Sequence, residues 1–139
     1  MYKMKPLLLV EDDEVDALTV KRSLEDNGIV DHIIHMTNGE EALDYLRSGI
    51  NERPSLILLD LNMPKMNGIE FLEAAKQHPA IRRIPVVVLT TSDEYRDILG
   101  SFEYSVAGYM VKPIHYADFV KIIETISKYW ALSLLPASV

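Results

Sequence analysis

Five polar or charged residues that end short apolar runs in this sequence have chemical types that work together. They are Glu11, Asp12, Asp60, Thr90 and Lys112. Taken singly, an Asp or a Thr after a strand is most often a turn residue or a helix cap. Together, the three carboxylates, the hydroxyl and the lysine are the groups that phosphoryl transfer to a carboxylate requires. This chemistry is predicted if the fold brings the five side chains to one place.

The three carboxylates in this group indicate that a cation binds among them. Three acids gathered at one point repel one another unless positive charge lies among them. Oxygen ligands favour Mg²⁺, which takes one or two carboxylates and a phosphate oxygen and keeps several waters. Such an ion would keep Asp60 ionised and nucleophilic. Lys112 can offer its ammonium to one phosphoryl oxygen, and Thr90 can offer its hydroxyl to another. We therefore predict an aspartyl-phosphate site with Mg²⁺ as cofactor.

The elements that must position these residues alternate along the chain. Apolar, β-rich runs predict five strands, at residues 7–10, 29–36, 56–59, 84–90 and 106–111. Helical periodicity follows each run, and the five predicted helices end near Gly28, Arg47, His78, Tyr104 and Trp130. Ser92 is the expected N-cap of the fourth helix. This alternation predicts an α/β fold with a doubly wound, five-stranded parallel sheet and helices on both faces.

The run before Asp60 shows why the fold gathers the polar residues. Residues 56–59 are all apolar and lie between Pro54 and Pro64, as expected for a strand buried on both faces. In an open parallel sheet the carboxyl ends of the strands share one edge, and ligands bind there. Four of the five predicted strands place one of the polar groups at that edge. The second strand, which ends at Thr37-Asn38, contributes nothing comparable.

Length and composition narrow the classes of protein. The chain has 139 residues, a formal charge of −7 and no cysteine. We expect one domain over 1–139, without disulfides or thiolate metal sites. The negative charge argues against direct binding of nucleic acid, which needs clustered Lys and Arg. No stretch approaches the roughly 20 apolar residues needed to span a membrane. A cytoplasmic protein with no membrane association is expected.

At these residues the sequence resembles the receiver domain of two-component response regulators. The resemblance covers about residues 5–128 and rests on an ordered set of motifs: Glu11-Asp12, Asp60 within Leu-Asp-Leu-Asn-Met-Pro, Asn67-Gly68, Thr90, Tyr109 and Lys112-Pro113. It implies the flavodoxin-like strand order 2-1-3-4-5 with five helices. In that order the switch point, where ligands bind, lies between the first and third strands.

The resemblance also implies a phosphoacceptor and a metal site. Asp60 resembles the residue that takes a phosphoryl group from a phosphohistidine, on a sensor histidine kinase or a phosphotransfer protein. Asp12 and Asp60 would bind Mg²⁺ directly, and Glu11 through water. The backbone carbonyl of Asn62 would complete the protein ligands.

The same resemblance assigns a switch. Thr90 and Tyr109 resemble the pair in which the hydroxyl moves onto the phosphoryl group and the ring turns inward behind it. Lys112-Pro113 resembles the Lys-Pro pair of the family, whose cis peptide bond directs the lysine inward. One residue departs from the family pattern: Thr91 stands where many receivers have Ala or Gly, so the lifetime of the phosphoryl group is left open.

Other polar residues are expected to have local roles. Asp13 is predicted to cap the first helix. The four histidines share no spacing typical of a metal site, and we interpret all of them as surface or loop residues: His32, His35, His78 and His115.

The C-terminal extension, residues 129–139, carries more apolar surface than the end of a single-domain helix needs. It can either fold back on its own domain or form an interface, because exposed apolar patches usually mark partners. With no output domain following, the chain resembles the small stand-alone receivers that partner bacteriophytochrome kinases. That resemblance implies a homodimer built partly on the C-terminal region.

Three functions are compared. The leading hypothesis is a stand-alone response regulator that switches a protein-binding surface near the fourth helix and fifth strand, and that is no enzyme beyond its own phosphorylation and dephosphorylation at Asp60. The rival is an aspartyl-phosphate phosphatase of the haloacid dehalogenase-like type. In that class the nucleophile follows the first strand and a second Asp lies two residues on, whereas here that position is Asn62. The third is a scaffold that works independently of phosphate.

Overall fold

The computed structural model describes residues 6–28, 30, 32–133 and 135–136. Its centre is a five-stranded parallel sheet in the order β2-β1-β3-β4-β5. The strands are β1 (Leu7–Val10), β2 (Ile33–Met36), β3 (Leu56–Leu59), β4 (Val86–Thr90) and β5 (Gly108–Val111). This is the strand order expected from the sequence, and it places β1 beside β3 at the centre of the sheet.

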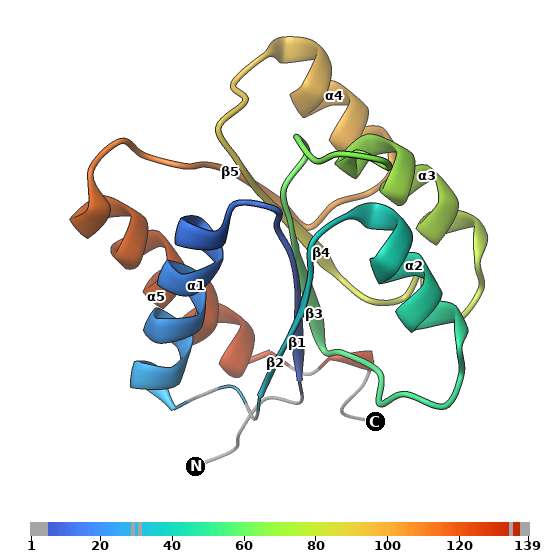
Figure 1. Ribbon diagram of the computed structural model, residues 1–139, viewed down its shortest axis with the longest axis horizontal. Coiled ribbons are helices and arrows are strands. Elements are labelled where there is room, and N and C mark those ends of the chain that lie inside the picture. Colours follow the sequence, from blue (N-terminus) through green and yellow to red (C-terminus); the bar gives the residue numbers. More distant parts are fainter. Residues whose placement is uncertain (1–5, 29, 31, 134, 137–139) are drawn as a thin grey trace.

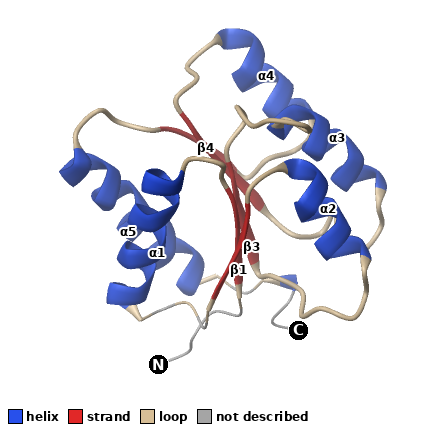
Figure 2. Ribbon diagram, in the orientation of Figure 1, coloured by secondary structure: helices blue, strands red, loops and turns tan. Residues whose placement is uncertain are grey.

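Five helices cover the two faces of the sheet (Figure 1). They are α1 (Glu14–Asn27), α2 (Gly39–Arg47), α3 (Gly68–Gln77), α4 (Tyr95–Glu103) and α5 (Tyr116–Ala131). Figure 2 shows the three layers, with α1 and α5 on one face and α2, α3 and α4 on the other. The doubly wound α/β architecture predicted from the alternation of strands and helices is confirmed.

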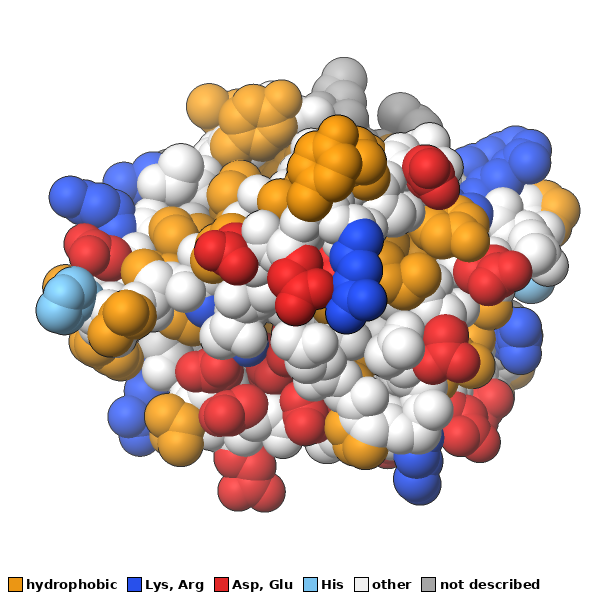
Figure 3. Space-filling view, turned by 90° about the horizontal axis from the view of Figure 1, so that it is seen from above, with side chains coloured by type: hydrophobic (Ala, Val, Ile, Leu, Met, Phe, Trp, Pro, Cys, Tyr) orange, Lys and Arg blue, Asp and Glu red, His pale blue; other side chains and the backbone are white. Residues whose placement is uncertain are grey.

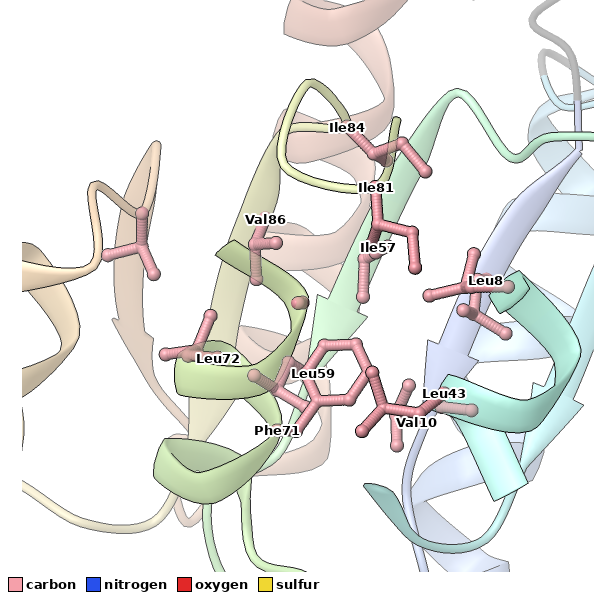
Figure 4. Close-up of a cluster of buried hydrophobic side chains, with 14 of the residues drawn as sticks. Leu8, Val10, Leu43, Ile57, Leu59, Phe71, Leu72, Ile81, Ile84 and Val86 are labelled. Atoms are coloured by element: carbon pink, nitrogen blue, oxygen red, sulfur yellow. The ribbon is translucent and has the colours of Figure 1, made fainter. Parts of the chain in front are cut away.

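The sheet has a hydrophobic core on each face because its inner strands alternate their side chains between the two layers. Leu8 and Val10 of β1 join the cluster under α2 and α3, whereas Leu7 and Leu9 join the cluster under α1 and α5. Figure 4 shows the first cluster, in which the ring of Phe71 lies among the side chains of β1 and β3. All residues of β1, β3 and β4 are buried, so the strands that precede Glu11, Asp60 and the loop after Thr90 form the enclosed centre of the fold.

Several helix ends are fixed by capping residues. The Asp13 carboxylate accepts from the backbone N–H of Asp16, so the predicted cap of α1 is confirmed. Asn67 and Glu70 form a capping box at the start of α3. Gly28 ends α1 in the left-handed conformation, with φ of 63°. Capping by Asp13 and by Asn67 thus fixes the start of the two helices that follow Glu11 and Asp60.

Some element boundaries differ from those expected. β4 and β5 each begin two residues later than predicted, and β2 is shorter than the predicted strand, whose residues 29 and 31 lie outside the described part. The predicted N-cap of α4 is wrong, because the helix begins at Tyr95 and Glu94 holds the cap position. The Ser92 hydroxyl instead donates to Asp97, at 2.5 Å, and accepts from the N–H of Glu94, at 3.3 Å.

The expected cis peptide bond is also wrong. The described residues contain no cis peptide bond, so Lys112-Pro113 is trans. Trans is the intrinsically favoured form even before proline, and Lys112 reaches the acidic residues from this backbone without it.

The C-terminal extension is partly folded back on its own domain. Leu135 is buried and packs with the cluster under α1 and α5. Tyr129 and Leu132 remain 65% and 90% exposed, respectively. The described part of the extension therefore has both a buried anchor and exposed apolar side chains, and the predicted interface stays a prediction. In the part of the chain that the structure describes, no helix has the length and apolar character to cross a membrane.

Candidate functional site

The polar residues at the carboxyl ends of the strands lie together at one edge of the sheet. Ligand oxygens of Glu11, Asp12 and Asp60 all lie within 4.8 Å of one another. Glu11 and Asp60 are buried, whereas Asp12 is exposed. Thr90 and Lys112, from the ends of β4 and β5, are buried at the same edge. Figure 3, which looks onto the molecule from this side, shows acidic side chains gathered between hydrophobic ones.

Backbone hydrogen bonds that continue the sheet beyond its strands hold these residues in place. The N–H of Asp60 donates to the Val10 carbonyl, at 3.0 Å, which holds the backbone of Asp60 beside β1. The N–H of Lys112 donates to the Thr90 carbonyl, at 2.7 Å. Asp60 and Lys112, one residue beyond their strands, are thus still hydrogen-bonded to the neighbouring strands of the sheet.

The side chain of Lys112 is surrounded by carboxylates. Its Nζ lies 2.5 Å from Glu11 Oε1 and 3.5 Å from Asp60 Oδ2. A third carboxylate, Asp16 Oδ2 on the first turn of α1, lies 2.9 Å from the same nitrogen. Sequence reasoning missed Asp16, because an acid in a first helical turn is ordinary there. The one available signal was its proximity in sequence to Glu11 and Asp12.

The electrostatics of the site follow from this crowding. Burial and the neighbouring Asp60 raise the pKa of the Glu11 carboxyl to about 8, against the opposing effect of Lys112. Burial alone would lower the pKa of the Lys112 ammonium, but the hydrogen bond that it donates to Glu11 and the charges of Asp60 and Glu11 hold that pKa above its ordinary value. The lysine is therefore permanently cationic, while Glu11 needs further positive charge nearby to ionise fully.

These donors fit a divalent cation. When ionised, the carboxylates of Glu11, Asp12, Asp16 and Asp60 exceed the single Lys112 ammonium by three negative charges. Hard carboxylate oxygens with one open, exposed member are the ligands that Mg²⁺ uses when it also binds a phosphoryl group. Among the described residues, Glu11, Asp12 and Asp60 form the group of acids that is close enough to hold an ion, and Asp16 is not part of it.

Asn62 lies beside Asp60, and the predicted role of its backbone carbonyl as a metal ligand stays a prediction. Its backbone N–H is 3.3 Å from Asp60 Oδ1. Asn62 and Asp12 line an open pocket of about 430 Å³, whose other walls include Met63, Asn67 and Asp97. The pocket lies next to Asp60 in sequence, because Leu61 and Asn62 both line it.

Thr90 and Tyr109 share a neighbour that sequence reasoning did not identify. The Tyr109 hydroxyl donates to the backbone carbonyl of Ser92, at 2.8 Å. The N–H of Ser92 lies 3.4 Å from Thr90 Oγ1. Tyr109 is half-buried against the core, and burial raises the pKa of its phenol. The loop between β4 and α4 thus connects the two residues of the predicted switch.

The histidines are only partly as expected. His35 is not a surface or loop residue, because it lies half-buried in β2 and its Nε2 donates to the Glu11 carbonyl, at 2.8 Å. His32 and His115 are exposed and lie outside the strands and helices. His78 follows α3, where its Nδ1 accepts from the N–H of Ala80. The prediction that they form no common metal site stands for the described residues.

Comparison with known proteins agrees with the site. The family model of the response regulator receiver domain matches residues 7–124. The response regulator Rcp1 of Synechocystis is 40% identical over 96% of this chain and 95% of its own length. The probable methanogenesis regulatory protein FilR2 of Methanothrix harundinacea is 39% identical over 89% of this chain and 82% of its own.

Solved structures of response regulators are also similar to this chain. The phosphorylated cyanobacterial phytochrome response regulator RcpA superimposes with a TM-score of 0.91 at 35% identity, over 96% of this chain and 99% of its own. The Mn²⁺-bound form of Rcp1 superimposes with a TM-score of 0.89 at 39% identity, over 95% of this chain and 99% of its own.

Proposed function

The chain belongs to the response regulator receiver domain family of two-component signalling, and we propose that Asp60 accepts a phosphoryl group from a sensor histidine kinase. One observation carries the proposal: Asp60 is buried at the carboxyl edge of the sheet, 3.5 Å from Lys112 and within the cluster of Glu11 and Asp12. A carboxylate in this position has one ammonium group nearby, from Lys112, and two further carboxylates that can share a metal ion with it.

The chemistry assigned to the site is a displacement at phosphorus. A carboxylate oxygen of Asp60 forms the new P–O bond while the P–N bond of the donor phosphohistidine breaks, and its electron pair goes to the imidazole nitrogen. Lys112 neutralises charge on one phosphoryl oxygen, and the Thr90 hydroxyl donates to another. Asp12, Asp60, Glu11 and the backbone carbonyl of Asn62 would hold Mg²⁺, which supplies further positive charge when bound.

The output is a change in a protein-binding surface. When Thr90 turns toward the phosphoryl group, the loop that ends at Ser92 moves with it, and the contact between Tyr109 and Ser92 transmits the change. The adjoining α4 and β5 carry exposed apolar side chains that suit a protein partner: Tyr95, Leu99, Phe102 and Val111. In this scheme phosphorylation alters the affinity of that surface, and the chain catalyses no reaction other than its own phosphorylation and dephosphorylation at Asp60.

The proposal also includes two partners, a phosphodonor kinase and a second copy of this chain. Similarity to Rcp1 and RcpA supports a phytochrome-type histidine kinase as the phosphodonor. The exposed Tyr129 and Leu132 support a homodimer that uses the C-terminal region. The organisation as one receiver domain over 1–139 and the cytoplasmic location both stay predictions.

The phosphatase alternative is not favoured. Asp60 follows β3 and not the first strand, and Asn62 occupies the position where that class has its second Asp.

Intact-mass measurement tests the proposal. Incubation with acetyl phosphate and Mg²⁺ should add one phosphoryl group to the wild-type chain, and Asp60→Asn should take up none. Equal uptake by the two proteins would refute the assignment of Asp60. A partner whose affinity is the same for the wild type and for Asp60→Ala would instead point to a phosphate-independent scaffold.

A further inference from the structure

Asp16 contacts the catalytic lysine although it belongs neither to the metal cluster nor to the phosphoacceptor. Its carboxylate lies 2.9 Å from Lys112 Nζ, across 96 positions of sequence. The position of Asp16 in the first turn of α1 is explained by the helix dipole. Its contact with Lys112 is not, because an acid in a first turn can equally point to solvent. The half-buried side chain, 29% exposed, instead points toward the site.

The distances around Lys112 show where the lysine is held. An ammonium has three N–H donors, and three carboxylates surround it. Glu11 is at 2.5 Å, Asp16 is at 2.9 Å and Asp60 is at 3.5 Å. In the unphosphorylated protein Lys112 therefore lies closer to Asp16 than to the nucleophile.

A phosphoryl group on Asp60 changes this arrangement. Its oxygens need an N–H donor of Lys112, so one of the carboxylates that now accept from Lys112 must lose that hydrogen bond. Glu11 is 2% exposed, and a carboxylate that is buried so deeply loses its partner at a high cost. Asp16 is open enough for water to replace the ammonium. Asp16 is the partner that can be exchanged.

We propose that Asp16 is a positioning residue that holds Lys112 back from Asp60 and competes with the phosphoryl group for the ammonium. The proposal rests on the proposed function, because the competitor is the phosphoryl group on Asp60. Its consequence is thermodynamic: removing the charge of Asp16 strengthens binding of a phosphoryl group, or of an anion of the same shape, at Asp60. Asp16 therefore sets how strongly the switch is held in its phosphorylated state.

Binding of fluoroberyllate in the presence of Mg²⁺ tests the competition, because this anion adds to a carboxylate and mimics a phosphoryl group. Titration calorimetry on the full chain should show that Asp16→Asn binds it about two- to fivefold more tightly than wild type, the range expected for a half-exposed ion pair. Asp16→Glu, which keeps the charge, should restore an affinity near that of wild type.

Two further variants separate this effect from a general loss of negative charge or of structure. Glu14→Gln removes one charge from the exposed side of the same helical turn, and it should bind fluoroberyllate as wild type does. In a Lys112→Ala background, Asp16→Asn should have no effect. Thermal unfolding of each variant verifies that it is folded.

The proposal fails if Asp16→Asn binds no more tightly than wild type, if Asp16→Glu binds as tightly as Asp16→Asn, if Glu14→Gln gives an equal gain, or if the gain persists without Lys112. Absence of both fluoroberyllate binding and phosphoryl uptake in the wild-type chain would instead refute the proposed function of the site.

Discussion

The side chains around Asp60 carry more negative charge than the single Lys112 can neutralise, and the residue-scale properties of the site follow from this imbalance. Glu11 is buried beside Asp60, and its ionisation is disfavoured until a cation arrives. His35 fixes the backbone of Glu11 from the neighbouring strand through the bond to its carbonyl. The backbone of Glu11 is thus held by a hydrogen bond, whereas the negative charge of the side chains at the site is balanced only when a cation binds.

This imbalance predicts that Mg²⁺ binding releases protons. Because the pKa of Glu11 is raised to about 8, most Glu11 carboxyls are protonated at pH 7, and a bound cation favours the ionised form. Apparent Mg²⁺ affinity should therefore rise with pH between about 6 and 8 and level off above that pKa. Calorimetry in buffers of different ionisation enthalpy measures the protons released.

Two variants control this measurement. Glu11→Gln should abolish the proton release, whereas Glu14→Gln should leave it unchanged. Binding heats that do not depend on the buffer in the wild-type chain would contradict the assignment to Glu11.

At the scale of elements, the site depends on how closely α3 approaches the end of β3. The N–H of Gly68 donates to the Leu61 carbonyl, at 2.9 Å. A Cβ at Gly68 would lie 2.7 Å from the Asp60 carbonyl oxygen and 2.7 Å from Leu61 Cα. Both contacts are with backbone atoms, so rotation of a flexible side chain cannot relieve them. The Asn67-Gly68 pair is therefore needed for packing as well as for the helix cap.

Gly68→Ala should accordingly displace the loop that carries Asp60. We expect a loss of about 1–3 kcal/mol in the free energy of unfolding, the usual effect of overpacking, together with slower phosphoryl uptake from acetyl phosphate. Urea unfolding and intact-mass kinetics measure the two effects.

Gly100→Ala, in α4, is the matched control. A Cβ there would meet only Ile69 Cδ1, at 3.8 Å, and alanine favours the helix. Its stability should not fall. A Gly68→Ala protein as stable and as active as wild type would show that the close approach is not required.

How far the sequence predicts this fold can be argued from single elements. The buried runs before Asp60 and Thr90 are apolar throughout, so their periodicity and the alternation with helices were enough to predict the sheet and its polar edge. The start of α4 was mispredicted because Ser92 bonds to Asp97 and to the Glu94 N–H in an extended turn, a choice between two local hydrogen-bonding patterns. Asp16 and Ser92 were missed because their partners, Lys112 and Tyr109, lie far away in sequence.

At the scale of the whole molecule, the C-terminal extension joins the domain through one side chain and leaves others exposed. Leu135 is 5% exposed and packs with the α1 and α5 cluster, whereas Leu132 is 90% exposed. Figure 1 shows the described residues of this extension near the amino ends of the strands, at the opposite edge of the sheet from the site. The extension can therefore contribute to stability and to a partner surface without obstructing phosphorylation.

The two leucines make a matched pair for testing this division. Leu135→Ala should lower the free energy of unfolding by about 2 kcal/mol or more, because it leaves a cavity in the core. Leu132→Ala should change it by less than about 0.5 kcal/mol. Urea unfolding followed by circular dichroism measures both. Equal effects of the two substitutions would mean that the extension is not anchored as described.

The central claim is that Asp60 carries the phosphoryl group, and chemical trapping tests it most directly. Borohydride reduces an aspartyl phosphate to homoserine, so the wild-type chain treated with acetyl phosphate and Mg²⁺ and then reduced should yield a peptide with homoserine at position 60. Omission of the phosphodonor should leave Asp60 intact. Homoserine at another aspartate, or none in a chain that has gained a phosphoryl group by mass, would contradict the account.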